Sequence, residues 1–266
     1  MLRYWADYTS AAFAKLKRDE LIAVLPVSAI EQHGPHLPVS VDTTISEGVV
    51  AETIKRLPDD LPVVFLPGQR VGKSNEHSRF PGTLTLSADT LLRVLMDIGE
   101  SVAASGVRKL VLLNSHGGQT AVLDIVARDL RVRHGLFTVA TATHAFGMPS
   151  GLFSAAESRF GIHAGDKETS MMLALRPDLV DMSKAERFVG LHERLAETNT
   201  HLSIGPLTKL GWQIQDLHPC GACGDAAAAT ADKGKQGLEF VAERFVELLR
   251  EIHEAPLTWL TNEPAW

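Results

Sequence analysis

Residues 21–38, which read LIAVLPVSAIEQHGPHLP, decide how this chain folds. The first five, Leu21-Ile22-Ala23-Val24-Leu25, form an unbroken apolar run with the length and branching of a strand that is buried on both faces. The polar part of the stretch begins where this strand is predicted to end. The sequence therefore predicts a buried strand that delivers a cluster of polar side chains to its carboxyl end.

Glu31 and His33 stand in that polar part, and Asp42 follows closely. If the chain stays extended there, Glu31 and His33 point the same way, because side chains two positions apart in a strand share a face. A carboxylate and an imidazole aimed at one point, with a second carboxylate nearby, suit a divalent metal ion. The alternative is that Glu31 and His33 are ordinary loop residues and that Asp42 is only the N-cap of a helix.

Composition limits the kind of protein to which this cluster belongs. A chain of 266 residues with 45% hydrophobic and 22% charged residues can bury a full core. It is most simply one α/β domain over residues 1–253, followed by a tail over residues 254–266. The formal net charge of -6 and the pI near 6.0 leave no electrostatic footprint for DNA or RNA. We therefore expect a small-molecule partner and no nucleic acid.

The sequence contains no segment typical of membrane insertion or secretion. No run approaches about 18 uncharged apolar residues, and charged residues such as Arg3 and Asp7 interrupt the N-terminal region. Cys220 and Cys223 are the only cysteines, which is too few for a disulfide framework. We therefore expect no membrane association and a cytoplasmic location.

Apolar runs and helical patterns alternate along the chain. Strands are predicted at residues 21–25, 63–66, 109–113 and 137–143, and helices at residues 43–57, 87–105, 120–134, 188–199 and 226–252. This order is the pattern of a parallel sheet covered by helices on both faces. Ligands collect at the carboxyl ends of strands in such sheets, and this places His116, directly after the third strand, on the same edge as Glu31.

Two further polar segments are candidates for function. Residues 67–83 are too rich in Gly, Pro and polar groups to form a regular element, and long loops inside compact domains are usually functional, so Ser74, Glu76 and His77 could line a substrate pocket. The second segment runs from His163 into an apolar helical stretch. There, Asp166 or Thr169 could merely cap the helix and Glu168 could merely be a favourable charge in its first turn.

Taken together, these segments resemble the successive signatures of the creatininase family of metal-dependent amidohydrolases. The matching motifs are Glu31-Gln32-His33-Gly34-Pro35-His36-Leu37-Pro38 with Asp42, then Phe80-Pro81-Gly82-Thr83, then Asn114-Ser115-His116-Gly117-Gly118, then His163-Ala164-Gly165 with Glu168-Thr169-Ser170. The resemblance implies a flavodoxin-like three-layer fold, two divalent ions of zinc, manganese or iron, and assembly as hexamers. Members of the creatininase family open the ring of creatinine, deformylate a pyrimidine nucleotide precursor, trim a modified peptide or open a sugar-derived ketone.

Carried over position by position, the resemblance implies five metal ligands, with Asp42 as the bridge between the ions: Glu31, His33, Asp42, His116 and Glu168. Three carboxylates against two ions of total charge about +4 leave roughly one positive charge, enough to bind a hydroxide between the ions. Two metals about 3.5–4 Å apart can hold that hydroxide and polarise a substrate carbonyl together. The nucleophile is then supplied without Ser or Cys.

The resemblance also implies a proton donor and supporting residues around the metals. His163 is expected to protonate the departing nitrogen as a general acid, and its alternative is a hydrogen-bonded histidine that supports the ligands. His36 is expected to orient a ligand through its ring N–H. Gly117 and Gly118 let the backbone after His116 pass close to the ions, and N–H groups of the following helix could receive a developing oxyanion.

Two features bear on the substrate and on other metal sites. Creatinine hydrolases tend to carry a bulky residue and a glutamate after the third-signature histidine, whereas this chain has Gly117 and Gly118, which argues against creatinine itself. Cys220-Gly221-Ala222-Cys223 suggests a zinc or redox site, but one such pair without a second ligand pair is weak support.

The sequence as a whole predicts a binuclear-metal amidohydrolase that cleaves a C–N bond of a small cyclic amide or formamide by a metal-bound hydroxide. Two alternatives stay open. The same ions could serve a hydrolase of a sugar-derived ketone or a short modified peptide. The chain could also be a catalytically silent metal-binding module.

Overall fold

The computed structural model describes residues 1–205, 208–261 and 263–264. Its centre is a parallel sheet of four strands in the order β2-β1-β3-β4, which is the start of the doubly wound flavodoxin-like order. The strands are β1 (Ile22–Val27), β2 (Val63–Phe65), β3 (Lys109–Asn114) and β4 (Phe137–Ala142). The predicted α/β class and the parallel sheet are confirmed, and every predicted strand lies within two residues of an observed one.

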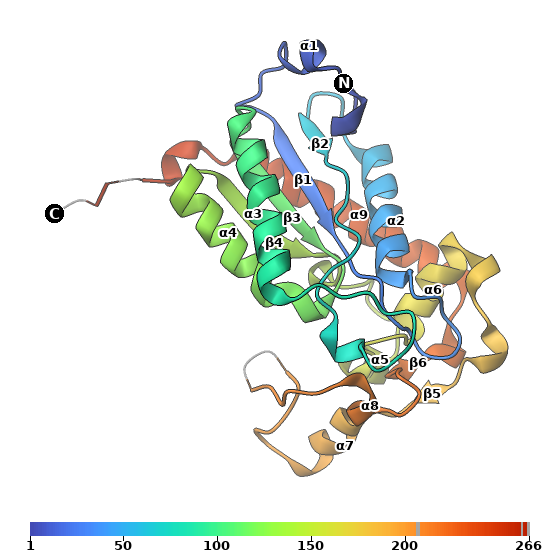
Figure 1. The fold of residues 1–266 in the computed structure, drawn as a ribbon. Coiled ribbons are helices and arrows are strands. Elements are labelled where there is room, and N and C mark those ends of the chain that lie inside the picture. The colour runs from blue at the N-terminus through green and yellow to red at the C-terminus, as the bar shows by residue number, and fades with distance from the viewer. Residues whose placement is uncertain (206–207, 262, 265–266) are drawn as a thin grey trace.

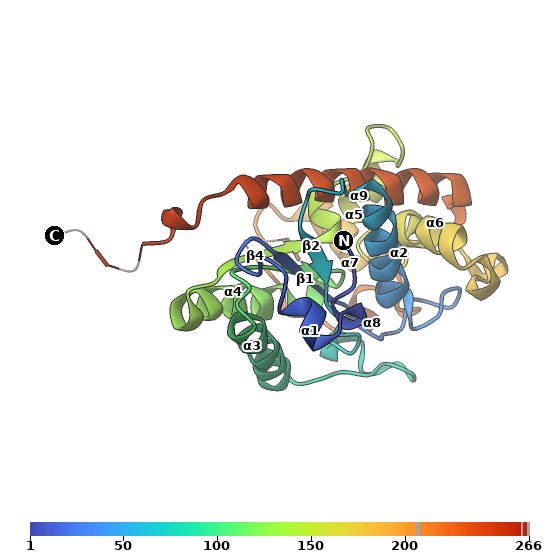
Figure 2. The same ribbon diagram turned by 90° about the horizontal axis from the view of Figure 1, so that it is seen from above.

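Helices cover both faces of the sheet, so the chain forms three layers (Figures 1 and 2). One face carries α3 (Ala88–Ala104) and α4 (Thr120–His134), and the other carries α2 (Val41–Arg56) and α9 (Ala231–Glu254). Alternate side chains of β1 serve the two faces: Ala23 and Leu25 pack with α3 and α4, whereas Ile22 and Val24 pack with α9. This double burial explains the unbroken apolar run at the start of the decisive stretch.

The remaining elements gather beyond the carboxyl end of the sheet (Figure 1). They are α5 (Ala155–Phe160), α6 (Asp166–Leu175), α7 (Leu191–Thr198), α8 (Ile214–Leu217) and the antiparallel pair β5 (Arg187–Phe188) and β6 (Gly224–Asp225). Short elements before the sheet are one 3₁₀ turn (Trp5–Asp7) and α1 (Ser10–Phe13). None of the helices in the described ranges combines the length and the hydropathy that a bilayer crossing requires.

The last helix begins later than its sequence predicts. Residues 226–228 form a 3₁₀ turn, and α9 starts only after Thr230, whose hydroxyl accepts a hydrogen bond from the Lys233 backbone N–H. Thr230 acts as the N-cap, since a threonine side chain satisfies a free N–H of the first turn better than an alanine can. The alanine run before it favours helix but supplies no such cap.

A lysine at the start of β3 holds the other end of α9. Lys109 is buried, and its Nζ donates hydrogen bonds to the carbonyl oxygens of Ile252, His253 and Ala255 at 2.7 to 2.8 Å. The last carbonyls of a helix lack partners within it and carry partial negative charge. The lysine therefore ties the C-terminal end of α9 to the central sheet.

Helix α6 packs closely along α9 and carries the late polar segment. Met171 and Met172 of α6 share a buried cluster with Leu238 and Val241 of α9, and Asp166 accepts a 2.7 Å hydrogen bond from Lys233 Nζ. At the crossing, Gly234 brings the two backbones together, because a methyl group there would overlap the Ser170 carbonyl. This contact fixes the position of the first turn of α6.

Candidate metal centre

Loops and helix starts at the carboxyl edge of the sheet bring together the five residues expected to bind metal. Glu31 and His33 lie in the loop after β1, Asp42 in the first turn of α2, His116 directly after β3, and Glu168 in the first turn of α6. Neighbouring parallel strands end at this edge, which is why segments far apart in the sequence meet here. All but the half-buried Glu168 are buried.

These side chains form groups of ligand atoms that could hold cations. His116 Nδ1 lies 3.2 Å from Glu31 Oε2 and 3.4 Å from Asp42 Oδ2. His33 Nε2 lies 3.5 Å from Asp42 Oδ1 and 3.8 Å from Glu168 Oε2. Three groups have ligand atoms all within 4.8 Å of one another: Glu31, Asp42 and His116; His33, Asp42 and Glu168; and Glu31, His33 and His163.

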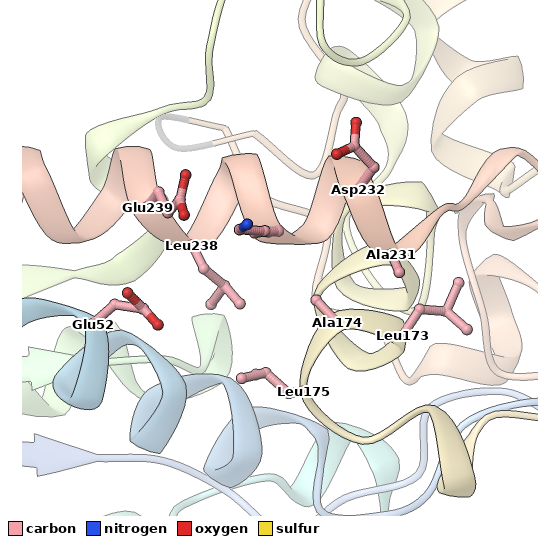
Figure 3. Close-up of a pocket in the computed structure, with 9 residues that line it drawn as sticks. Glu52, Leu173, Ala174, Leu175, Ala231, Asp232, Leu238 and Glu239 are labelled. Carbon is pink, nitrogen blue, oxygen red and sulfur yellow. The ribbon is translucent and has the colours of Figure 1, made fainter.

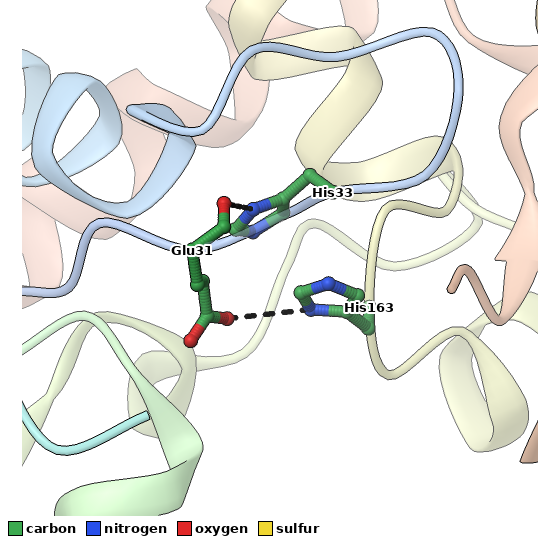
Figure 4. A group of neighbouring side chains, drawn as sticks. All are labelled: Glu31, His33 and His163. Carbon is green, nitrogen blue, oxygen red and sulfur yellow. Dashed lines mark hydrogen bonds and ion pairs between the residues drawn. The ribbon is translucent and has the colours of Figure 1, made fainter. Parts of the chain in front are cut away.

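Two buried atoms at the centre have no hydrogen-bond partner in the described part of the chain. They are His33 Nε2 and Asp42 Oδ2, on side chains that are only 1% and 2% exposed. His33 Nδ1 donates to the Glu31 carbonyl at 3.0 Å, so the lone pair of Nε2 faces the group (Figure 4). Buried polar atoms are normally satisfied, and nitrogen and carboxylate oxygens suit zinc, manganese and iron, so the residues fit a divalent cation.

Asp42 does not act as the helix cap that the alternative interpretation required. Ser40 occupies the N-cap position of α2, and Asp42 lies inside the first turn with its carboxylate between two histidines. Likewise, Gly165 is the N-cap of α6, and Asp166 and Thr169 do not cap it. The Asp166 carboxylate instead accepts hydrogen bonds from Ser170 and Lys233.

The carboxylates of the cluster favour positively charged groups beside them. Burial alone would lower the pKa of His33, but hydrogen bonding and charge from Asp42, with Glu168, outweigh it and raise that pKa to about 9. Burial likewise opposes a charged His116, yet Glu31 and Asp42 raise its pKa well above the usual value. Burial raises the pKa of Glu31. The carboxylates thus draw protons onto the imidazoles, which a bound cation would replace.

His163 lies beside the cluster, as the sequence predicts. Its Nδ1 is 3.6 Å from Glu31 Oε1, and its ring lies beside the tilted His33 ring, 4.1 Å away from centroid to centroid (Figure 4). Its Nε2 donates to the Gln32 carbonyl oxygen at 2.8 Å, so the lone pair of Nδ1 faces the cluster. Burial, followed by the charge of His33, lowers the pKa of His163 to about 4, so its ring is neutral at pH 7.

The long loop after β2 contacts the predicted metal ligands through three side chains. Ser74 is buried, and its hydroxyl donates to Glu31 Oε2. His77 Nε2 lies 3.5 Å from Glu31 Oε1, and burial together with the neighbouring His163 lowers the pKa of His77. Glu76 faces His116 rather than open space, with its Oε1 3.2 Å from His116 Nε2. The loop therefore contacts Glu31 and His116 directly.

His36 and the two glycines take different places. His36 Nε2 lies 2.9 Å from Thr169 Oγ1, one residue after Glu168, and its ring stacks on Phe188. A methyl group at Gly117 would meet no atom of the described residues within 4 Å, whereas one at Gly118 would overlap the Glu76 carboxylate. A side chain at Gly117 would thus point into open space, whereas one at Gly118 would collide with Glu76.

The cysteine pair does not join the cluster. Cys220 and Cys223 are both free, the first exposed and the second buried. Burial raises the pKa of Cys223 to about 12, which makes its thiol unreactive. Within the described ranges, neither cysteine belongs to a group of metal-ligating side chains.

The outer helices border a separate groove of about 520 Å³ (Figure 3). Its walls come from α2, α6 and α9 and include Glu52, Leu175, Asp232, Lys235 and Glu239. None of the residues predicted to act in metal binding or catalysis lines it. The groove is therefore distinct from the metal centre.

Sequence reasoning missed two residues that organise the cluster. The Gln32 side-chain amide donates to the Gly221 carbonyl and lies 2.8 Å from His77 Nδ1. Asn114 brackets His116 by donating to its carbonyl at 2.6 Å and accepting from its N–H at 3.0 Å. Both residues stand inside the motifs quoted above. The available signal was their position, since Gln32 stands between Glu31 and His33 and Asn114 stands two residues before His116.

Known proteins are similar to this chain over most of its length. It is 31% identical over 233 residues to the mycofactocin precursor peptide peptidase of Mycobacterium tuberculosis, covering 85% of this chain and 84% of that protein. It is 27% identical over 273 residues to the creatinine amidohydrolase of Pseudomonas putida, covering 93% of this chain and 94% of the other.

Solved structures share the fold. A crystal structure of creatinine amidohydrolase (creatininase) superposes with a TM-score of 0.75 at 25% identity, covering 95% of this chain and 98% of that one. A structure described as "Creatininase Mn" gives a TM-score of 0.75 at 24% identity, covering 96% and 100%. The profile of the family described as "Creatininase: Creatinine amidohydrolase" matches residues 6–249, and the chain therefore belongs to the creatininase family of hydrolases.

Proposed function

We propose that this chain is an amidohydrolase that uses two divalent ions to cleave a C–N bond in a small cyclic amide or formamide. The observation that carries the proposal is the position of Asp42. Its Oδ1 faces His33 Nε2 at 3.5 Å, and its Oδ2 faces His116 Nδ1 at 3.4 Å, so the two oxygens point to different ligand groups. A carboxylate in this position suits a bridge between two ions.

Each ligand group would hold one ion. Glu31, Asp42 and His116 form the first, and His33, Asp42 and Glu168 form the second. When bound, a pair of divalent ions would polarise the substrate carbonyl and lower the pKa of water towards about 7. Ser74 supports the first group by donating its hydroxyl hydrogen bond to Glu31. The metals proposed are zinc, manganese or iron, because all three accept nitrogen and carboxylate oxygen ligands.

His163 is the proposed carrier of the proton that the departing nitrogen needs. Its Nε2–H is held by the Gln32 carbonyl, which leaves Nδ1 free to take a proton at the cluster and return it to the nitrogen. Because the pKa of His163 is lowered to about 4, the ring is neutral at pH 7 and must accept this proton before it can donate it. In this proposal His163 therefore acts first as a general base and then as a general acid.

Replacing His163 by glutamine is expected to lower kcat by about 100-fold to 10,000-fold, the usual contribution of a positioned proton carrier, while both ions are retained. Steady-state kinetics and elemental analysis on the same samples would measure this. His201→Gln, at an exposed position, serves as the control. Loss of metal from the His163 variant would contradict the proposed role and make His163 a ligand, since it also lies in a group with Glu31 and His33.

A short peptide is the second candidate substrate, and the open space at Gly117 favours it. No atom of the described residues lies within 4 Å of a methyl group placed there, so the backbone beside His116 borders open space that an extended substrate could use. The relative from Mycobacterium tuberculosis is named as a peptidase. Peptide cleavage also breaks a C–N bond and would use the same residues.

A substrate panel on metal-loaded protein tests the function. We expect hydrolysis of a formamide, a cyclic amide or a short peptide, loss of all turnover after removal of metal by a chelator, and recovery on adding zinc or manganese. Hydrolysis of a sugar-derived ketone alone would contradict the C–N bond assignment. Turnover of no panel member in any metal form would contradict the enzyme assignment and favour a metal-binding module.

The compartment and assembly proposed for this enzyme are the cytoplasm and a homohexamer. The two free cysteines support a reducing compartment. The hexamer rests on family resemblance alone, and size-exclusion chromatography with light scattering would test it.

A further inference from the structure

Glu76 lies on the opposite side of the His116 ring from the other carboxylates. His116 Nδ1 faces Glu31 and Asp42, at 3.2 and 3.4 Å, while Nε2 lies 3.2 Å from Glu76 Oε1 and 3.1 Å from the Lys73 carbonyl oxygen. Both atoms beside Nε2 are acceptors, so Nε2 carries the proton and donates it. The lone pair of Nδ1 is then directed at the first ligand group.

Glu76 is itself held in place by a neighbouring lysine. Lys73 Nζ donates to Glu76 Oε2 and to the Gly118 carbonyl oxygen, both at 3.1 Å. The Glu76 side chain is only 10% exposed, so its contacts exclude most water. This arrangement ties the loop after β2 to the backbone that follows β3.

Gly118 leaves the space that the Glu76 carboxylate occupies. A methyl group at position 118 would overlap Glu76 Oε1 and would lie 2.5 Å from His116 Nε2. Gly117, in contrast, borders open space, so the chain would tolerate a side chain there. The Glu76 carboxylate thus explains why position 118 is a glycine, but it does not explain the glycine at position 117.

We propose that Glu76 is a positioning residue for His116 and that Gly118 is glycine in order to admit it. A carboxylate that accepts the far N–H of a metal-binding imidazole fixes its tautomer and ring orientation and raises its basicity. In this proposal Glu76 acts through His116, whereas the sequence alone suggested only that it could line a substrate pocket. The inference rests on the proposed function, because it takes His116 to be a metal ligand.

Zinc affinity, measured by competition with a chelating dye, tests this role. Glu76→Gln keeps the side-chain volume but removes the charge, and we expect zinc binding about 10- to 100-fold weaker. Glu47→Gln is the matched control, because Glu47 pairs with Arg70 on the exposed side of α2, and it is expected to bind zinc as the wild type does. The melting temperature of the metal-free protein separates this effect from a merely structural one, which would lower stability without changing zinc affinity.

Gly118→Ala tests the second half of the proposal. In the presence of Glu76, the added methyl group is expected to weaken zinc binding at least as much as Glu76→Ala does, because it displaces the carboxylate. In a Glu76→Ala background, the same methyl group is expected to cost much less, so the two changes are coupled. Equal losses in both backgrounds would overturn the link between the two residues.

The outcomes distinguish this inference from the function on which it rests. Wild-type zinc affinity in both Glu76 variants, with turnover retained, would overturn the inference and leave the proposed hydrolase intact. Failure of the wild-type protein and of Glu47→Gln to bind zinc would overturn both.

Discussion

Asp42→Asn is expected to remove both proposed ions and to lower kcat/KM by about 1,000-fold or more, roughly 4 kcal/mol of transition-state stabilisation. The reason is that Asp42 is the one carboxylate shared by the two ligand groups that face His33 and His116. An asparagine keeps the volume but offers a neutral amide in place of two charged oxygens. Elemental analysis of the purified protein and kinetics on the substrate it hydrolyses would measure the two losses together.

Variants of the unshared ligands provide the comparison. Glu168→Gln and His116→Ala each affect one ligand group, so each is expected to leave about one ion per chain bound. Asp59→Asn, at an exposed position after α2, is the matched control and is expected to retain full metal content and activity. Two ions bound to the Asp42→Asn protein would rule out the bridging role.

Gly234→Ala is expected to destabilise the fold by about 3 kcal/mol, because overpacking at a rigid contact is costly. The new methyl group would overlap the carbonyl of Ser170 and lie 2.7 Å from the Met171 nitrogen, and backbone atoms cannot move aside without separating α6 from α9. For a chain of this size the melting temperature should fall by roughly 6 to 12 °C. Since α6 carries Glu168, the variant should also lose part of its bound metal.

Gly237→Ala, one turn further along the same helix, is the matched control. A methyl group there would meet only the tips of two flexible side chains, at 3.2 Å from Met148 Sδ and 3.3 Å from Met171 Cε. Those tips can move, and alanine favours helix over glycine by about 1 kcal/mol, so little net change in stability is expected. Equal melting temperatures for the two variants would contradict the close backbone contact. Calorimetry on metal-free protein would make the comparison.

The central sheet could be predicted because its strands are buried on both faces. Such strands give unbroken apolar runs, as residues 21–25 and 110–113 show, and the helices between them have regular apolar spacing. The two-residue strands β5 and β6 are too short to leave any periodicity, and they were not predicted. Residues 1–20 form only a 3₁₀ turn and the four-residue α1. The aromatic spacing there reflects packing of Trp5 and Phe13 against the core.

The candidate ligands could be predicted because each stands in a compact motif, yet their surroundings could not. Gln32 binds the residues around it through its side-chain amide, and the sequence gives no sign of which distant groups it reaches. Glu76 could be assigned from the sequence only to the surroundings of the site; its contact with His116 depends on the absence of a side chain at Gly118. Contacts that depend on two loops meeting in space leave no periodic pattern in either loop.

The order of the ligands along the chain has a consequence for biosynthesis. The group formed by Glu31, Asp42 and His116 is complete once β3 and the residues after it have left the ribosome, whereas Glu168 emerges only later, with α6. Nascent chains fold from the N-terminus onwards. In the proposed two-ion site, one cation position could therefore close during translation, while the other must wait until α9 has been synthesised and packs along α6.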